Sequence, residues 1–189
     1  ADGISLFNFI YSRPVNREDG QLHGGSYNPG DPPWDLIKRF DDVEWLEKQP
    51  QHYWINWWWK TGFNGRQFQL PKIFVNHDEH YFDLDMALPE GGVKGGRLRL
   101  MTSEGTPGLG WEVWINGNKL RPSDDVSEPF EDPYGGFLGE PVQYSAFEIT
   151  PEAVNDGTNK IRVRLGDGPL AEEFTTELMY IDLAIHPAD

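Results

Sequence analysis

The residues of this chain best suited to chemistry are aromatic rings that lie close in sequence to carboxylates. One group falls in the long segment 121–139, where Phe130, Tyr134 and Phe137 are interspersed with acidic residues such as Asp132. Aromatic rings can stack on the apolar faces of sugar rings, and carboxylates accept hydrogen bonds from hydroxyl groups. A connection of this length is commonly functional. The segment therefore predicts either a glycan-binding loop or an ordered lid over a core.

A second aromatic group is the run Trp57, Trp58 and Trp59, which follows Tyr53 and Trp54. Successive side chains of a strand point to opposite faces, so we expect at least one face of this run to be buried. A buried indole also needs a partner for its N–H group. The run therefore predicts either a platform for sugar rings or an aromatic seam inside the core or against another domain.

The charge of the chain narrows the class of partner. It has 16 basic and 31 acidic residues, which gives a formal net charge of −15 at pH 7. Such a chain repels phosphates, which excludes nucleic acids and anionic membrane surfaces as natural partners, and it favours neutral over anionic polysaccharides. The chain has no cysteine, so disulfides and thiolate metal sites are excluded. No apolar run approaches the roughly 20 residues that a membrane-spanning helix needs.

The elements that must position these groups are short strands. Apolar and polar residues alternate over 111–115, and the Asn-Gly pair at 116–117 predicts a tight hairpin turn. The same alternation returns over 161–165. In this pattern Trp111 faces the core side, and it also lies at the rim of the loop 102–110. We therefore include Trp111 among the candidate glycan-binding residues.

Further strands are expected at similar spacing, separated by turns rich in Gly, Pro, Asn and Asp. They cover residues 68–74, 81–86, 97–101, 142–149 and 178–185. Short strands with these turns are typical of two antiparallel sheets packed face to face. Residues 67–189 are therefore predicted to form a mainly β domain, an antiparallel β-sandwich or jelly roll.

The first 50 residues follow a different pattern. A nearly continuous apolar strand over 4–11 leads into a glycine-rich loop and then into helical spacing from Asp31 onward. A second short helix is expected over 43–48, with the pair Asp41-Asp42 at its N-terminal cap. Residues 1–50 are predicted to be a strand-loop-helix segment that either belongs to another domain or packs on the sandwich. Residues 51–66 are expected to connect it to the sandwich.

Two stretches of the sequence resemble known families. Residues 111–120 and 147–165 are similar to the pattern Trp-x-Asn-Gly followed by Ile-Thr-Pro and Gly-x-Asn-x-Ile-x-Val of galactose-binding-like jelly rolls. These are sugar-recognising sandwich domains attached to many glycoside hydrolases. Residues 1–50 resemble the last strand and helix of the (β/α)8 barrel that precedes such a domain, through Gly-x-x-Leu-Phe-Asn at 3–8 and Pro-Trp-x-x-Ile at 33–37.

The resemblance implies a non-catalytic carbohydrate-binding or accessory module of a secreted or periplasmic glycoside hydrolase. Its partners would be a polysaccharide or oligosaccharide and the catalytic domain of the same chain. The sequence begins Ala-Asp-Gly, with neither an initiator methionine nor a signal peptide, so we expect a piece of a longer protein.

The resemblance also implies a structural calcium ion. Many such modules hold Ca²⁺ with carboxylates from early and last strands, and Asp83, Asp85 and Asp182 occupy similar positions here. Calcium takes six to eight oxygen ligands, so backbone carbonyls would have to complete the site.

Two alternatives remain open at this stage. One is a purely structural domain that buttresses a catalytic domain. The other is a jelly-roll polysaccharide lyase or hydrolase, in which His52, His77 or Tyr81 would supply a base. The sequence contains no nucleophile elbow, phosphate-binding loop or dinucleotide fingerprint, and it assigns no catalytic residue.

Overall fold

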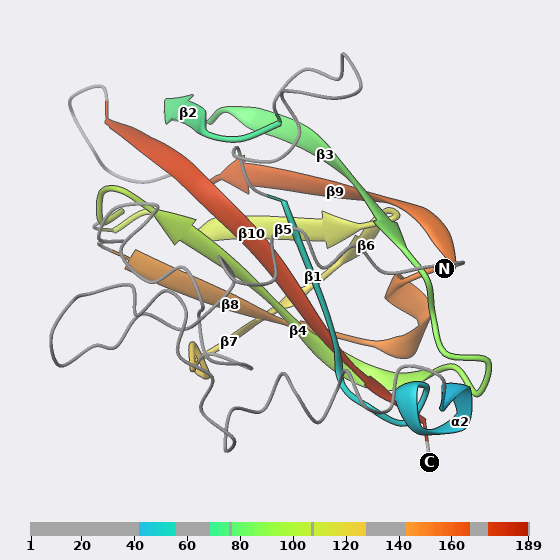
Figure 1. The fold of residues 1–189 in the computed structure, drawn as a ribbon. Coiled ribbons are helices and arrows are strands. Elements are labelled where there is room, and N and C mark those ends of the chain that lie inside the picture. Colours follow the sequence, from blue (N-terminus) through green and yellow to red (C-terminus); the bar gives the residue numbers. More distant parts are fainter. Residues whose placement is uncertain are drawn as a thin grey trace, which may run out of the picture. The chain divides into compact units, whose positions relative to one another are not determined.

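A computed structural model describes most of the C-terminal three quarters of the chain (Figure 1). The described residues are 42–55, 69–75, 77–106, 108–127, 143–166 and 174–188. The chain divides into two compact units, Ala1–Leu46 with Glu128–Glu140, and Glu47–Ser127 with Pro141–Asp189.

The described part of the first unit is the short helix α2 (Val43–Leu46) with the residue before it. The backbone N–H of Trp45 donates to the Asp42 carboxylate at 3.0 Å. An aspartate at this position satisfies an N–H group that has no partner within the helix. The predicted start of the helix and its cap are therefore confirmed.

The second unit is a β-sandwich of two antiparallel sheets, as the strand pattern predicts (Figure 1). The six-stranded sheet contains β1 (Gln51–Ile55), β2 (Lys72–Val75), β4 (Val93–Thr102), β7 (Arg121–Ser123), β8 (Gln143–Ile149) and β10 (Thr175–Pro187). The four-stranded sheet contains β3 (Glu79–Met86), β5 (Trp111–Ile115), β6 (Asn118–Lys119) and β9 (Gly157–Leu165). A 3-10 turn, η2 (Pro151–Ala153), precedes β9.

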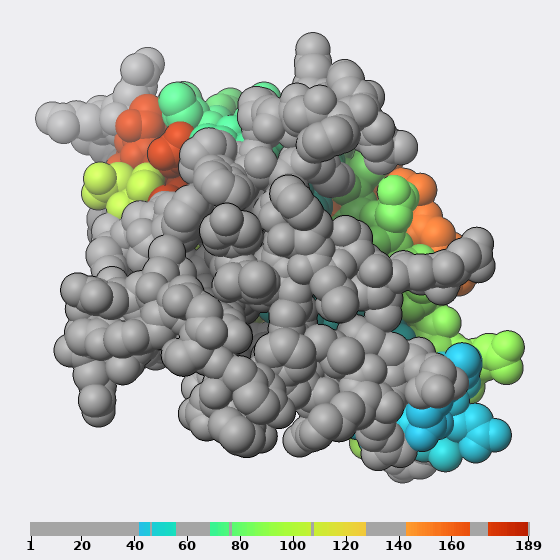
Figure 2. All heavy atoms as spheres, viewed as in Figure 1, coloured from blue at the N-terminus to red at the C-terminus, as the bar shows by residue number. Residues whose placement is uncertain are grey.

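The longest strand, β10, organises the six-stranded sheet, whose order is β1-β10-β4-β8-β7. One edge of β10 pairs with β4, and the other edge pairs with β2 at residues 175–178 and with β1 at residues 181–185. The pair of β2 with the start of β10 reaches the surface at the upper left of Figure 2. Residues 51–55 fall within the range expected to be a connector, and here they form β1 of this sheet.

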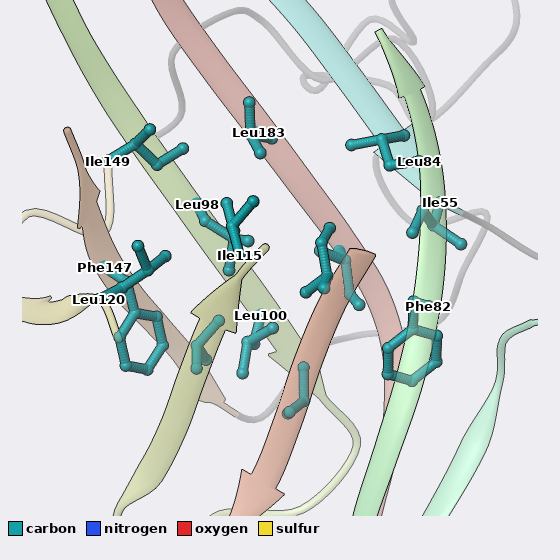
Figure 3. Close-up of a cluster of buried hydrophobic side chains, with 14 of the residues drawn as sticks. Ile55, Phe82, Leu84, Leu98, Leu100, Ile115, Leu120, Phe147, Ile149 and Leu183 are labelled. Atoms are coloured by element: carbon teal, nitrogen blue, oxygen red, sulfur yellow. The ribbon is translucent and has the colours of Figure 1, made fainter. Parts of the chain in front are cut away.

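The core lies between the sheets and is built by alternate residues of each strand. Along β9, Ile161, Val163 and Leu165 are fully buried, while the arginines between them are only partly buried. Figure 3 shows side chains from both sheets meeting in one apolar cluster, among them Phe82 of β3 and Leu183 of β10. Each sheet also has an outer face, which points away from this core.

A network of amides fixes the hairpin after β5 against the start of β9. The turn has positive φ at Asn116 and at the glycine after it, the conformation that favours an Asn-Gly pair. The Asn116 side chain donates to the Ala153 backbone carbonyl at 3.0 Å and to the side-chain oxygen Oδ1 of Asn159 at 2.8 Å, and it accepts from the Lys160 N–H at 3.0 Å. Asn159 in turn binds both backbone groups of Asn155. These bonds set the register between β5 and β9.

Candidate functional site

Most of the residues predicted from the sequence to bind glycan lie outside the described residues. These are Trp57, Trp58, Trp59, Phe130, Asp132, Tyr134 and Phe137. Their assignment stays a prediction.

Trp111 is described, and it lies in the core. Its side chain is 6% exposed, and its ring meets Phe74 edge-on, with 5.0 Å between centroids and 84° between planes. Edge-to-face packing of this kind is a favoured arrangement of buried aromatic rings. The structure therefore gives Trp111 a scaffold role, in agreement with its core-facing position in the strand pattern.

The segment 121–139, predicted to be a loop, begins with strand β7, and its next residues are held by two arginines of β4. Arg97 donates to the Asp125 carbonyl at 3.0 Å and to the Ser127 carbonyl, and it forms an ion pair with the Asp125 carboxylate. Arg99 donates to the Val126 carbonyl at 3.2 Å. Hydrogen bonds from Ser127, and then the charge of Arg97, lower the pKa of the exposed Asp125 carboxyl. Three consecutive backbone carbonyls are thus fixed on the outer face of the six-stranded sheet.

The three carboxylates expected to hold calcium are divided between the two sheets. Asp83 and Asp85 lie on the outer face of β3, where Asp85 accepts a hydrogen bond from the Thr158 hydroxyl at 2.6 Å. Asp182 lies on β10 and points away from the core, between the core residues Ile181 and Leu183. In the part of the chain that the structure describes, no group of three or more histidine or acidic side chains could hold a metal ion. The described residues thus supply no common ligand set, and calcium binding stays a prediction.

Asp182 instead belongs to a buried ionic cluster on the outer face of the six-stranded sheet. Arg99 donates to its two carboxylate oxygens, from Nε at 3.0 Å and from Nη2 at 2.5 Å, and the two residues are only 4% and 1% exposed. His52 Nε2 lies 3.4 Å from the same carboxylate, and the Arg99 guanidinium lies 5.5 Å from the Tyr144 ring centre. Burial raises the pKa of Asp182, but the hydrogen bonds and charges of His52 and Arg99 outweigh it and lower the pKa overall. The centre of this outer face is therefore closed to solvent.

The outer face of the four-stranded sheet is open and carries a row of side chains that crosses every strand. We call it the Trp114 row: Lys119 on β6, Trp114 on β5, Arg162 on β9 and Tyr81 on β3 are successive cross-strand partners. The Arg162 guanidinium lies 3.5 Å from the Trp114 ring centre, and the Lys119 ammonium lies 5.2 Å from it. Tyr81 is 57% exposed, and its hydroxyl donates to Glu79 at 2.6 Å. Cations over an indole are held by the electron-rich ring face.

The charges around the Trp114 row compensate one another. Glu112 forms ion pairs with Lys119 and, at 3.2 Å, with Arg164, while Glu79 lies 3.6 Å from Arg162. Exposed ion pairs of this kind contribute little to folding stability, but they restrict the conformations of the paired side chains on the sheet surface. The result is a surface on which the exposed Tyr81 ring and the half-buried Trp114 ring lie among closely placed donors and acceptors, with the Arg162 guanidinium over the Trp114 ring.

The Trp114 row was not among the candidate sites predicted from the sequence, although part of the signal was present. Alternation over 111–115 places Trp114 on the side opposite Trp111. Tyr81 was considered only as a catalytic base. It lies on the outer face of one sheet, whereas His52 lies on the outer face of the other, so these two candidates for a base are not brought together.

Comparisons with known proteins supply no family for this chain, since no protein-family model matches it and no curated protein matches significantly. Among the described residues, no helix has the length and apolar character that crossing a membrane requires. The outer faces of the two sheets are therefore the basis for assigning a function to this chain.

Proposed function

We propose that this chain is a non-catalytic module that binds polysaccharide or oligosaccharide, and that it serves a secreted or periplasmic glycoside hydrolase. One observation carries the proposal: on the outer face of the four-stranded sheet, the half-buried Trp114 and the exposed Tyr81 lie on either side of Arg162. Sugars combine apolar ring faces with many hydroxyl groups. A surface that recognises them needs both ring faces and closely spaced hydrogen-bonding groups.

The polar groups of this face suit recognition of hydroxyl groups. Glu79 and Glu112 are each held by neighbouring cations, which keeps their oxygens in fixed positions as acceptors. Arg162 and Arg164 present several N–H donors each. Because the proposed site is the surface of a sheet, we expect weak affinity, with a Kd in the micromolar to millimolar range.

A second role in support of a catalytic domain is favoured by the other outer face. Arg99, Asp182 and Ala184 point away from the core of the sandwich but are at most 4% exposed. A sheet whose two faces are both buried at its centre is suited to packing rather than to ligand binding. We propose that the six-stranded sheet serves structural support, while the four-stranded sheet serves binding.

The proposal is tested by affinity electrophoresis and calorimetry of the purified chain with a panel of soluble polysaccharides. Reducing ends and unsaturated products are measured in the same mixtures. Binding of at least one polysaccharide without product release is the expected result. Release of products would contradict the non-catalytic role, and failure to bind any polysaccharide would leave only the structural role.

A further inference from the structure

We infer that the Trp114 row binds a neutral glycan chain that lies across the strands, parallel to the row. The inference rests on the proposed function and specifies its ligand class and orientation. Its basis is the register of the sheet, which aligns Lys119, Trp114, Arg162 and Tyr81 on four neighbouring strands.

The spacing of the two rings fits an extended ligand. Neighbouring strands are about 4.8 Å apart, so Trp114 on β5 and Tyr81 on β3, separated by β9, are about 10 Å apart along the row. One sugar ring cannot reach both aromatic side chains, whereas a short chain of sugars can. Affinity should therefore rise with the number of linked sugars until the row is covered.

Arg162 occupies the middle of this path. Its guanidinium is supported by the Trp114 ring at 3.5 Å, and its contact with Glu79, at 3.6 Å, is longer than a hydrogen bond. A guanidinium has five N–H donors in a fixed plane. Arg162 is thus suited to donate to the hydroxyl groups of a sugar that bridges the two aromatic residues.

The charge of the face favours a neutral chain. The cations of the row are matched by Glu112 and Glu79, so the face offers no excess of positive charge to a uronic acid or sulfate group. The whole chain carries a formal charge of −15, which repels polyanions at longer range. Binding should therefore change little with ionic strength, because screening acts mainly on charge–charge attraction.

The experiment is calorimetric titration of the folded chain with neutral gluco-, xylo- and manno-oligosaccharides of increasing length. Polygalacturonate serves as the anionic comparison, and each titration is made at low and high sodium chloride. The variants on the four-stranded sheet are Trp114→Ala and Tyr81→Ala. Trp54→Ala tests the six-stranded sheet, where Trp54 is 48% exposed, and Ile73→Ala is the control, because Ile73 is 62% exposed on that same sheet. Circular dichroism checks that each variant is folded. Tyr81→Phe is a conservative control that keeps the ring, and Tyr81→Ala carries the test if Trp114→Ala fails to fold.

We expect affinity for one neutral series to increase with chain length and to change less than about twofold with salt. Trp114→Ala and Tyr81→Ala should each weaken binding about three- to tenfold, while Ile73→Ala and Tyr81→Phe stay within about twofold of the parent.

Salt-sensitive binding of polygalacturonate alone, or affinity independent of chain length, would overturn the inference and leave glycan binding standing. Loss of binding in Trp54→Ala but not in Trp114→Ala or Tyr81→Ala would move the site to the six-stranded sheet. Absence of any glycan binding would overturn both the inference and the proposed function.

Discussion

Replacement of Asn159 by alanine should destabilise the sandwich more than most single substitutions. The Asn159 side chain is completely buried and makes four hydrogen bonds. It accepts from Asn116 Nδ2 and the Asn155 N–H, both at 2.8 Å, and it donates to the carbonyls of Asn155 at 2.7 Å and Gly157 at 3.1 Å. At about 1 kcal/mol for each bond, the loss is about 4 kcal/mol of the free energy of unfolding. For a domain of this size, Tm should fall by about 10 °C.

The assay is urea unfolding followed by tryptophan fluorescence, with the slope m compared between variants. Asn118→Ala is the matched control, because Asn118 is an exposed asparagine of the hairpin after β5, with one long contact, 3.4 Å, to the Glu152 carbonyl. Asn118→Ala should lower the free energy of unfolding by less than about 0.5 kcal/mol. If Asn159→Ala and Asn118→Ala differ by less than 1 kcal/mol at equal m, the amide network does not set the register as described.

Three further predictions concern the six-stranded sheet. Asp182→Ala should lower the free energy of unfolding by about 3–5 kcal/mol, because it leaves Arg99 buried without its carboxylate partner. The double variant Arg99→Met with Asp182→Leu should recover most of this loss in the same urea assay. The pKa of Asp182 is lower in the folded chain than in the unfolded chain. The ionised carboxylate therefore stabilises the fold at pH values above the unfolded pKa of about 3.9, and this stabilisation is lost as the pH falls through the folded pKa. The urea midpoint of the parent chain should therefore decrease below about pH 4, and that of the double variant should decrease less steeply. The same pH profile in the parent and the double variant would contradict this role of Asp182. Gly96→Ala should be strongly destabilising, since its Cβ would lie 2.2 Å from the Ala184 carbonyl oxygen, whereas Gly91→Ala, with nothing within 4 Å, should leave Tm within about 2 °C of the parent.

The local pattern of the sequence was sufficient to predict the sandwich class and several of its strands. Alternation over 111–115 and 161–165, with an Asn-Gly turn, depends only on neighbouring residues, and it specifies which side chains face the core. β1 was harder to predict. Its residues 51–55 mix histidine, tyrosine and tryptophan without a clear alternation, and the strand is fixed by pairing with β10 more than a hundred positions later in the chain.

The two outer faces could not be predicted from local pattern alone. Arg97 and Arg99 alternate with leucines, which is typical of a strand with one solvated face, but Arg99 is buried by its pairing with the distant Asp182. The outward direction of Trp114 was predictable from alternation. Its alignment with Tyr81 was not, because it depends on the register of three strands brought together only in the folded chain.

The central claim is that the outer face of the four-stranded sheet binds glycan. The most direct measurement is an NMR titration of the isotope-labelled chain with the neutral oligosaccharide that binds best. Amide shifts should change in β3, β5 and β9 around Tyr81, Trp114 and Arg162, while those at the centre of the six-stranded sheet stay unchanged. Shift changes confined to the six-stranded sheet, or scattered without relation to this face, would contradict the claim.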